Sequence, residues 1–244
     1  MGNYEEQLLH ELIIWQKKMT KKPTLSNQLT KGLQKKVNQI IPEKVHTIIT
    51  STIKNMVRAV LAGSEFISKQ PINGDLSLEA REKLVRQKID FYKKTAATSG
   101  AGTGAGGLLV GLADFPILLS LKIKFLFDAA GLYNFNTCVF SERLYILHLF
   151  QLAFSSQEKR NEVYNHIINW DKKTGGFSVD IDSFDWRSFQ QEYRDYIDLA
   201  KMMQLVPVIG AFVGAYANYK LMDNLGETAM NGYRLRLLNK GDLK

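Results

Sequence analysis

The fold of this chain is decided by two uncharged stretches, TAATSGAGTGAGGLLVGLA at residues 95–113 and MMQLVPVIGAFVGAYANY at residues 202–219. Both are rich in glycine and alanine. Glycines four residues apart lie on one face of a helix, and the missing Cβ atoms let a second helix approach closely. Because neither stretch has charges that would solvate it alone, we predict a buried pair of glycine-rich helices that pack face to face.

The predicted helix-packing residues are Gly102, Gly104, Gly106, Gly107 and Gly111 in the first stretch, and Gly210 and Gly214 in the second. Each glycine costs a helix interior about 0.5–1 kcal/mol, so packing has to offset this number of them. Residues 102–107 also fit the pattern G-x-G-x-x-G. A dinucleotide site needs a strand before these glycines, and a P-loop needs Lys-Ser or Lys-Thr after them; the sequence has neither. Packing is therefore favoured, and phosphate binding is the alternative.

A possible polar site accompanies the glycines and consists of Thr103, Asp114 and Asn218. Asp114 precedes Phe115-Pro116, and we expect it to cap the next helix, because aspartate accepts free backbone N–H groups and proline suits a first turn. A catalytic role for Asp114 is the alternative. Asn218 is expected to hydrogen-bond across helices or to the loop around Asp114.

Apolar residues recur at helical spacing through most of the chain, which predicts an all-α, multi-helix domain. The first four expected helices are one with Leu8, Leu12, Trp15 and Met19 on one face, then 25–40, 42–67, and 78–95 with Ser77 as its cap. They are followed by 116–133, one capped by Ser141 with Leu144, Leu147 and Leu152 on its face, and one to Trp170 with a Ser155/Glu158 capping box. A long last helix is expected to begin at Asp182 or Asp185, run through Met203, pause at Pro207 and resume to about Leu238. Residues 177–181 alternate in polarity, but one such segment does not make a sheet.

The net charge of +8 is concentrated near the N-terminus, where residues 17–58 contain ten Lys and Arg against one acidic residue. We predict that this region binds an anionic surface through Lys17, Lys18, Lys21, Lys22, Lys31, Lys35 and Lys36. A solvated helix face is the ordinary alternative. Residues 17–58 contain no aromatic side chain, which argues against binding of single-stranded nucleic acid. Residues 1–41 are thus expected to be basic amphipathic helices, continuous with a helical domain at 42–244.

Catalytic or metal-binding spacing is not found in the sequence. His10, His46, His148 and His166 do not pair at helical spacing with one another or with the single cysteine, Cys138. We expect Cys138 to be a small buried apolar residue. No catalytic residue, metal or cofactor is predicted, and a chain with one cysteine suits a reducing, cytoplasmic compartment.

The glycine-rich segments resemble the EcsC family of bacterial proteins. The matching residues are 99–107, Ala113-Asp114-Phe115-Pro116, 206–215, Asn218-Tyr219 and Gly226, and the resemblance extends from about residue 45 to residue 236. The family has no agreed activity, and its name implies a link to a bacterial ABC transporter system. We therefore expect a non-catalytic accessory protein that is peripheral to the cytoplasmic membrane and binds an anionic membrane surface or a membrane protein complex. The alternatives are insertion of the two uncharged stretches as a membrane hairpin, and an enzyme or binding protein that uses the glycines for a phosphorylated or lipid ligand.

Overall fold

A computed structural model of the 244-residue chain describes residues 3–21, 43–63, 76–104, 115–171 and 210–241. The helices in these ranges are α1 (Asn3–Met19), α3 (Glu43–Ala62), α4 (Leu78–Gly104), α6 (Phe115–Leu132), α7 (Phe140–Phe154), α8 (Gln157–Ile168) and α11 (Gly210–Lys240). The described residues contain no strand, so the all-α prediction is confirmed. The expected helix at 25–40 and the alternating segment at 177–181 lie outside the described residues.

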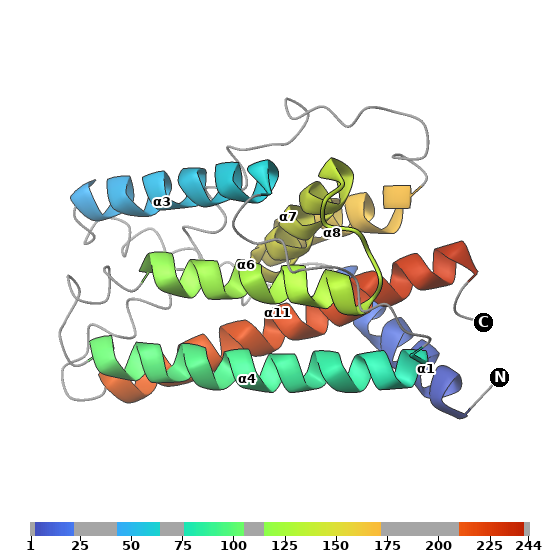
Figure 1. Cartoon of the computed structure of the whole chain (residues 1–244). Helices are drawn as coiled ribbons and strands as arrows, with labels where there is room; N and C mark the ends of the chain where they lie inside the picture. Colours follow the sequence, from blue (N-terminus) through green and yellow to red (C-terminus); the bar gives the residue numbers. More distant parts are fainter. Residues whose placement is uncertain (1–2, 22–42, 64–75, 105–114, 172–209, 242–244) are drawn as a thin grey trace.

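The centre of the fold is α11, which contacts α1, α4, α6, α7 and α8 (Figure 1). Between Leu225 and Leu237 every residue of this helix except Glu227 is buried. The buried part includes Arg234 and Arg236, and both guanidinium groups bind carboxylates of neighbouring helices. Although α11 contains charged residues, it can lie at the centre of the fold because its buried charged groups have partners inside the protein.

The most extensive helix pair is α4 with α11, which run antiparallel (Figure 1). Glu82 binds Arg234 at one end of their contact, and Lys93 binds Asp223 further along. Eleven residues separate the two contacts on each helix, so the register is constant. Between them, nearer the Lys93–Asp223 contact, a Cβ atom on Gly226 would lie 2.7 Å from Cδ1 of Ile89, so this glycine lets the backbone of α11 approach α4 closely.

The residues predicted to form the apolar face of the first helix are the ones that the structure buries. Leu8, Leu12, Trp15 and Met19 are all buried in α1, and the Trp15 ring packs edge-on against Tyr164 of α8, with 5.7 Å between ring centroids. One side of α1 is thus covered by α8 and α11. Its other side is available to solvent.

Two predicted helix ends were wrong. The helix expected to reach residue 67 ends at Ala62, because Gly63 adopts a left-handed conformation with φ of 76° and donates its N–H to the Ala59 carbonyl at 2.9 Å. The helix expected to end near Thr95 continues to Gly104. Its added residues carry no charge, and Ala96 among them is buried.

The predicted caps have mixed outcomes. Ser77 accepts the N–H of Ala80 at 3.3 Å, which confirms it as the cap of α4. Ser141 is not a cap: it lies in the first turn of α7, whose N-cap is Val139. The α8 cap is Ser156, which accepts the N–H of Lys159, and the neighbouring Ser155 donates instead to the carbonyl of Gln151.

Candidate functional site

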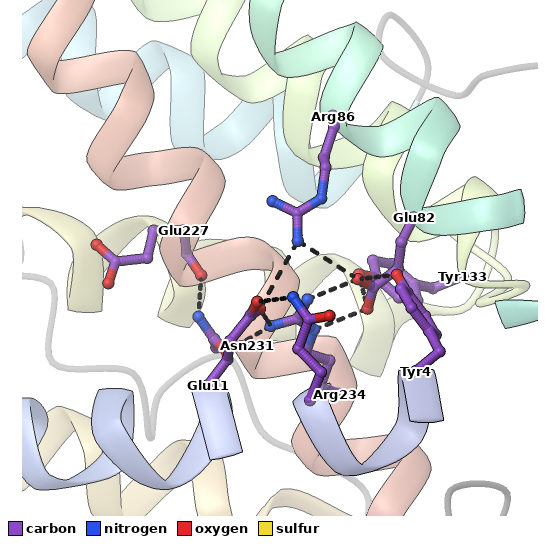
Figure 2. Close-up of polar contacts among 9 residues, drawn as sticks. Tyr4, Glu11, Glu82, Arg86, Tyr133, Glu227, Asn231 and Arg234 are labelled. Carbon is purple, nitrogen blue, oxygen red and sulfur yellow. Dashed lines mark hydrogen bonds and ion pairs between the residues drawn. The ribbon is translucent and has the colours of Figure 1, made fainter. Parts of the chain in front are cut away.

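A buried ion pair joins the two principal helices. Arg234 of α11 donates from Nε to Oε1 of Glu82 at 2.7 Å and from Nη2 to Oε2 at 2.6 Å. The residues are 2% and 0% exposed. Tyr4 of α1 and Tyr133, which follows α6, donate their hydroxyls to the same carboxylate at 3.0 and 3.1 Å (Figure 2). Four segments distant in sequence therefore meet at Glu82.

The first helix adds a second carboxylate to this network. Glu11 of α1 accepts from Nη1 of Arg234 at 3.0 Å, and the same Nη1 donates to Oδ1 of Asn231 at 3.1 Å (Figure 2). Arg86 of α4 lies 3.7 Å from Glu11 and 4.0 Å from Glu82. A further ion pair, Lys18 with Glu227 at 2.8 Å, fixes the C-terminal end of α1 to α11. The network therefore sets the orientation of α1.

The surroundings shift the pKa values of Arg234 and Glu11 so that their charged forms are favoured, and the pKa of Tyr4 so that its neutral form is favoured. Burial lowers the pKa of Arg234, but the hydrogen bonds and charge of Glu82 outweigh it and raise that pKa above its ordinary value. Burial raises the pKa of Glu11, and the hydrogen bond from Gln7 and the charge of Arg234 bring it below its ordinary value. Burial, together with the Glu82 carboxylate, raises the pKa of Tyr4 to about 12. Tyr4 is therefore neutral at physiological pH.

A cleft of about 440 Å³ lies beside this network, between α1, α4 and α11. Seven of its lining residues are charged: Glu11, Arg86, Asp90, Lys93, Asp223, Glu227 and Arg234. Most of them form ion pairs with one another, including Lys93 with Asp223 at 2.6 Å. The cleft consequently has no strong preference for an anion.

A second buried cluster is centred two residues later on α11, at Arg236. Arg236 binds Glu142 of α7 at 2.6 Å and Asp171 at 3.0 Å, and Tyr233 donates to the same Glu142 at 3.2 Å. The guanidinium of Arg236 lies over the ring of Phe135, 4.0 Å from its centroid. This cluster fastens α7 and the end of α8 to α11.

The chemistry open to these clusters is limited. A carboxylate that accepts two bonds from an arginine and two from tyrosines has no free lone pair with which to take a proton from a substrate. No group of three or more His, Cys, Asp or Glu side chains within the described ranges has the geometry of a metal site. The Glu82 network therefore serves to position helices. The surface of the helix that it orients, α1, is a better candidate for a functional site than the network itself.

That surface is the outer side of α1. Ile13 and Ile14 are 49% and 55% exposed, Lys17 stands exposed on the same side, and Lys21 is exposed just beyond the end of the helix. Neither lysine has an ion-pair partner among the described residues. Lys18, also predicted to bind an anionic surface, pairs with Glu227 and is still exposed. The predicted lysines Lys22, Lys31, Lys35 and Lys36 lie outside the described residues.

The predicted glycine contact is only partly within the described residues. Gly102, Thr103 and Gly104 belong to the last turns of α4, and Gly210 and Gly214 to the first turns of α11. Gly106, Gly107, Gly111 and Asp114 lie outside the described residues. The residues that precede the G-x-G-x-x-G pattern form a helix rather than a strand, which argues against a dinucleotide site. Face-to-face packing of the glycines remains a prediction.

Asn218 is buried, 5% exposed, on the third turn of α11. Its Nδ2 atom has no hydrogen-bond partner among the described residues. The hydrogen bond across helices that we predicted for it is therefore not observed within that part of the chain.

Two smaller features differ from what the sequence indicated. Cys138 is exposed, not buried, because it lies in the turn between α6 and α7, where its N–H binds the side chain of Asn136.

His148 and His166, distant in sequence, stack with ring centroids 5.6 Å apart. Nothing in their spacing predicted this contact.

The Glu82 network was also missed, although the sequence carries a signal for it. Glu82 falls on the apolar stripe of α4, in line with Leu78, Val85 and Ile89, and Arg234 falls between Met230 and Leu237 on α11. Opposite charges that interrupt two apolar stripes predict a buried pair. Their pairing across 152 residues does not follow from the pattern.

Comparison with known proteins gives the family. The family model described as the EcsC protein family matches residues 6–238. The chain belongs to the EcsC family. It is 44% identical over 233 residues to protein EcsC of Bacillus subtilis (strain 168), which covers 96% of both chains. The resemblance inferred from the glycine-rich segments is thereby confirmed.

A second relative is more distant. The EcsC-family chain is 31% identical over 141 residues to the uncharacterized protein YdbA of the same organism, and this match covers 58% of our chain and 52% of the relative. No solved structure matches the chain. Among the described helices of this EcsC-family protein, none combines the length and the apolar character needed to cross a membrane.

Proposed function

We propose that this protein is a non-catalytic accessory protein that binds the anionic surface of the cytoplasmic membrane through α1 and the basic segment that follows it. The outer side of α1 supports this proposal, because it presents exposed Ile13, Ile14 and Lys17, and exposed Lys21 follows just after the helix. Apolar residues with lysines around them are the composition of a helix that lies in the membrane interface.

The orientation of α1 makes this side available. Its opposite side is buried, and Tyr4, Glu11 and Lys18 attach its flanks to α4 and α11. Glu6 is the exposed acidic residue on the outer side and lies about two turns before Ile13, toward the N-terminal end of the helix. The membrane contact is therefore assigned to the second half of α1.

The expected affinity is moderate. A lysine near an anionic surface contributes about 1 kcal/mol, and apolar side chains add about 25 cal/mol for each Å² removed from water. Two lysines and two partly exposed isoleucines give reversible binding, and the basic residues predicted at 22–36 would strengthen it. The membrane partner that we propose is the ABC transporter system implied by the family resemblance.

Vesicle sedimentation tests the proposal. The full chain should sediment with phosphatidylglycerol vesicles at low salt, remain in solution with phosphatidylcholine vesicles, and be released by high salt. Lys17→Glu with Lys21→Glu should abolish sedimentation, and Ile13→Gln with Ile14→Gln should weaken it.

The matched control variants carry the same kinds of substitution, Lys→Glu and Ile→Gln, on helices other than α1. Lys94→Glu with Lys220→Glu alters charge equally on α4 and α11, and Ile117→Gln alters an isoleucine on α6 that is 55% exposed. These variants should bind like the unmodified protein. Equal sedimentation with both lipids, or equal loss in the control and α1 variants, would refute the proposal.

A further inference from the structure

A second cavity, of about 430 Å³, lies between the start of α4, the turn after α6 and the end of α11. Two cations, Arg81 and Lys240, line it together with Asn134, and no carboxylate does. This distinguishes it from the cleft beside Arg234, where acidic and basic side chains alternate. The volume falls in the range of about 300–1,000 Å³ that small-molecule sites occupy.

The cations of this cavity have no ion-pair partners among the described residues. Lys240 lies over the ring of Phe135, with Nζ 4.7 Å from its centroid. With its amide oxygen turned toward Arg81, Asn134 accepts from Nη2 at 2.9 Å and from Nη1 at 3.3 Å. Arg234 and Arg236 each bind carboxylates, so the positive charge at Arg81 and Lys240 is comparatively unbalanced.

The turn after α6 places Asn134 rigidly. Phe135 donates its N–H to the Ala130 carbonyl and Asn134 donates to Gly131, which is the Schellman arrangement for ending a helix. Asn134 occupies the left-handed position with φ of 64°, a conformation that asparagine tolerates. Its side-chain oxygen therefore holds the Arg81 guanidinium in place beside the cavity.

The cavity also lies at the N-terminal end of α4, a helix of 27 residues. The start of a helix carries roughly half a positive elementary charge, so it adds to the field of the two side chains. Leu78 and Leu237 form apolar walls beside these donors. Two cations and a helix start beside leucine side chains fit a phosphate group with a small organic substituent.

We propose that this cavity binds a phosphate ester through Arg81 and Lys240, with Asn134 positioning the Arg81 guanidinium. The phosphate can come from a soluble metabolite or from a lipid headgroup, and both present the same group to the same donors. This site is separate from the outer side of α1, so it does not depend on the membrane contact proposed for that helix.

A titration of the full chain with sn-glycerol 3-phosphate, followed by ¹⁵N nuclear magnetic resonance at constant ionic strength, tests the proposal. Saturable shifts are expected at residues 78–81, 134 and 240, and chloride at the same ionic strength should produce none. Arg81→Gln and Lys240→Gln should each weaken binding by about tenfold or more, which is the effect of losing one charge-assisted bond. Lys94→Gln, on the other end of α4, should leave it unchanged.

The melting temperatures of the variants show whether they fold, and Arg81→Lys, which keeps the charge, should retain part of the binding. Competition separates the two sources: glycerol phosphate lowers binding to phosphatidylglycerol vesicles only if a lipid headgroup enters the cavity. Non-saturating shifts, shifts spread over the lysines of α1, or equal affinities for Arg81→Gln and the unmodified protein would overturn the assignment.

Discussion

Glu82 and Arg234, 152 residues apart in the chain, form two hydrogen bonds of 2.7 and 2.6 Å inside the contact between α4 and α11. Neither side chain is accessible to water. Because Tyr4 and Tyr133 donate to the same carboxylate, the pair also fixes α1 and the end of α6. The orientation of the proposed membrane-binding side therefore depends on a salt bridge at the centre of the protein.

Removing one partner of this pair should be strongly destabilising. Arg234→Met leaves the Glu82 carboxylate buried and uncompensated, which costs about 3–5 kcal/mol in buried pairs. Urea unfolding followed by circular dichroism should show this loss. The double variant Glu82→Leu with Arg234→Met should recover part of the stability, and a double variant less stable than the sum of the two single changes would contradict the pairing.

The close approach at Gly226 predicts a contrast between two helical glycines. Gly226→Ala places a Cβ atom 2.7 Å from Ile89, so we expect a loss of about 1–3 kcal/mol in the free energy of unfolding. Gly131→Ala meets no atom within 4 Å and should be neutral or stabilise α6 by up to about 1 kcal/mol. Thermal unfolding of both variants makes the comparison, and equal effects would show that the helices do not approach closely at Gly226.

The register of α4 and α11 sharpens the prediction about the glycine-rich segments. If the register continues for nine residues beyond the Lys93–Asp223 contact, we expect Gly102 of α4 to lie opposite Gly214 of α11. Gly102→Leu and Gly214→Leu should each destabilise the protein by about 1–3 kcal/mol or more, because branched side chains would separate the backbones. Unfolding midpoints unchanged from the unmodified protein would place these glycines outside a helix contact.

Buried tyrosines predict alkaline unfolding. Burial raises the pKa of Tyr133, Tyr145 and Tyr233 well above 10. In the unfolded chain these phenols ionise near pH 10, whereas in the folded protein they stay protonated, so the unfolded state binds fewer protons above that pH. The stability that they contribute is present below pH 10 and falls as pH rises beyond it.

Spectrophotometric titration at 295 nm checks this expectation. Part of the ten tyrosines should ionise near pH 10 with helicity intact, and the buried ones should ionise only together with the loss of helical circular dichroism. Ionisation of all tyrosines near pH 10 without unfolding would show that the three rings are accessible to solvent.

The sequence predicted those parts of the fold that depend on local periodicity. The buried face of α1 and the cap at Ser77 follow from spacing and from residue type within a few turns. The end of α3 was missed because Gly63 offers a left-handed termination that outweighs a continuing apolar period. The helix predicted at 78–95 and the start of the glycine-rich helix predicted after it form one continuous helix as far as Gly104, because no helix-breaking residue separates them.

The candidate sites depended on information that no single segment contains. Lys17 and Lys18 are adjacent and identical, yet Lys17 is exposed without an ion pair in the described residues and Lys18 binds Glu227. Only the position of α11 distinguishes them. The cavity at Arg81 and Lys240 likewise joins residues from opposite ends of the domain, which sequence spacing does not bring together.

The central claim is that the outer side of α1 enters the membrane interface, and a fluorescent label tests it most directly. In a Cys138→Ser background, Ile14→Cys carries an environment-sensitive nitrobenzoxadiazole group on α1, and Gln87→Cys carries it on the exposed side of α4. Phosphatidylglycerol vesicles should increase the emission and shift it to the blue for the label at residue 14 and leave the label at residue 87 unchanged. An unchanged spectrum at residue 14, or equal changes at both positions, would contradict the account.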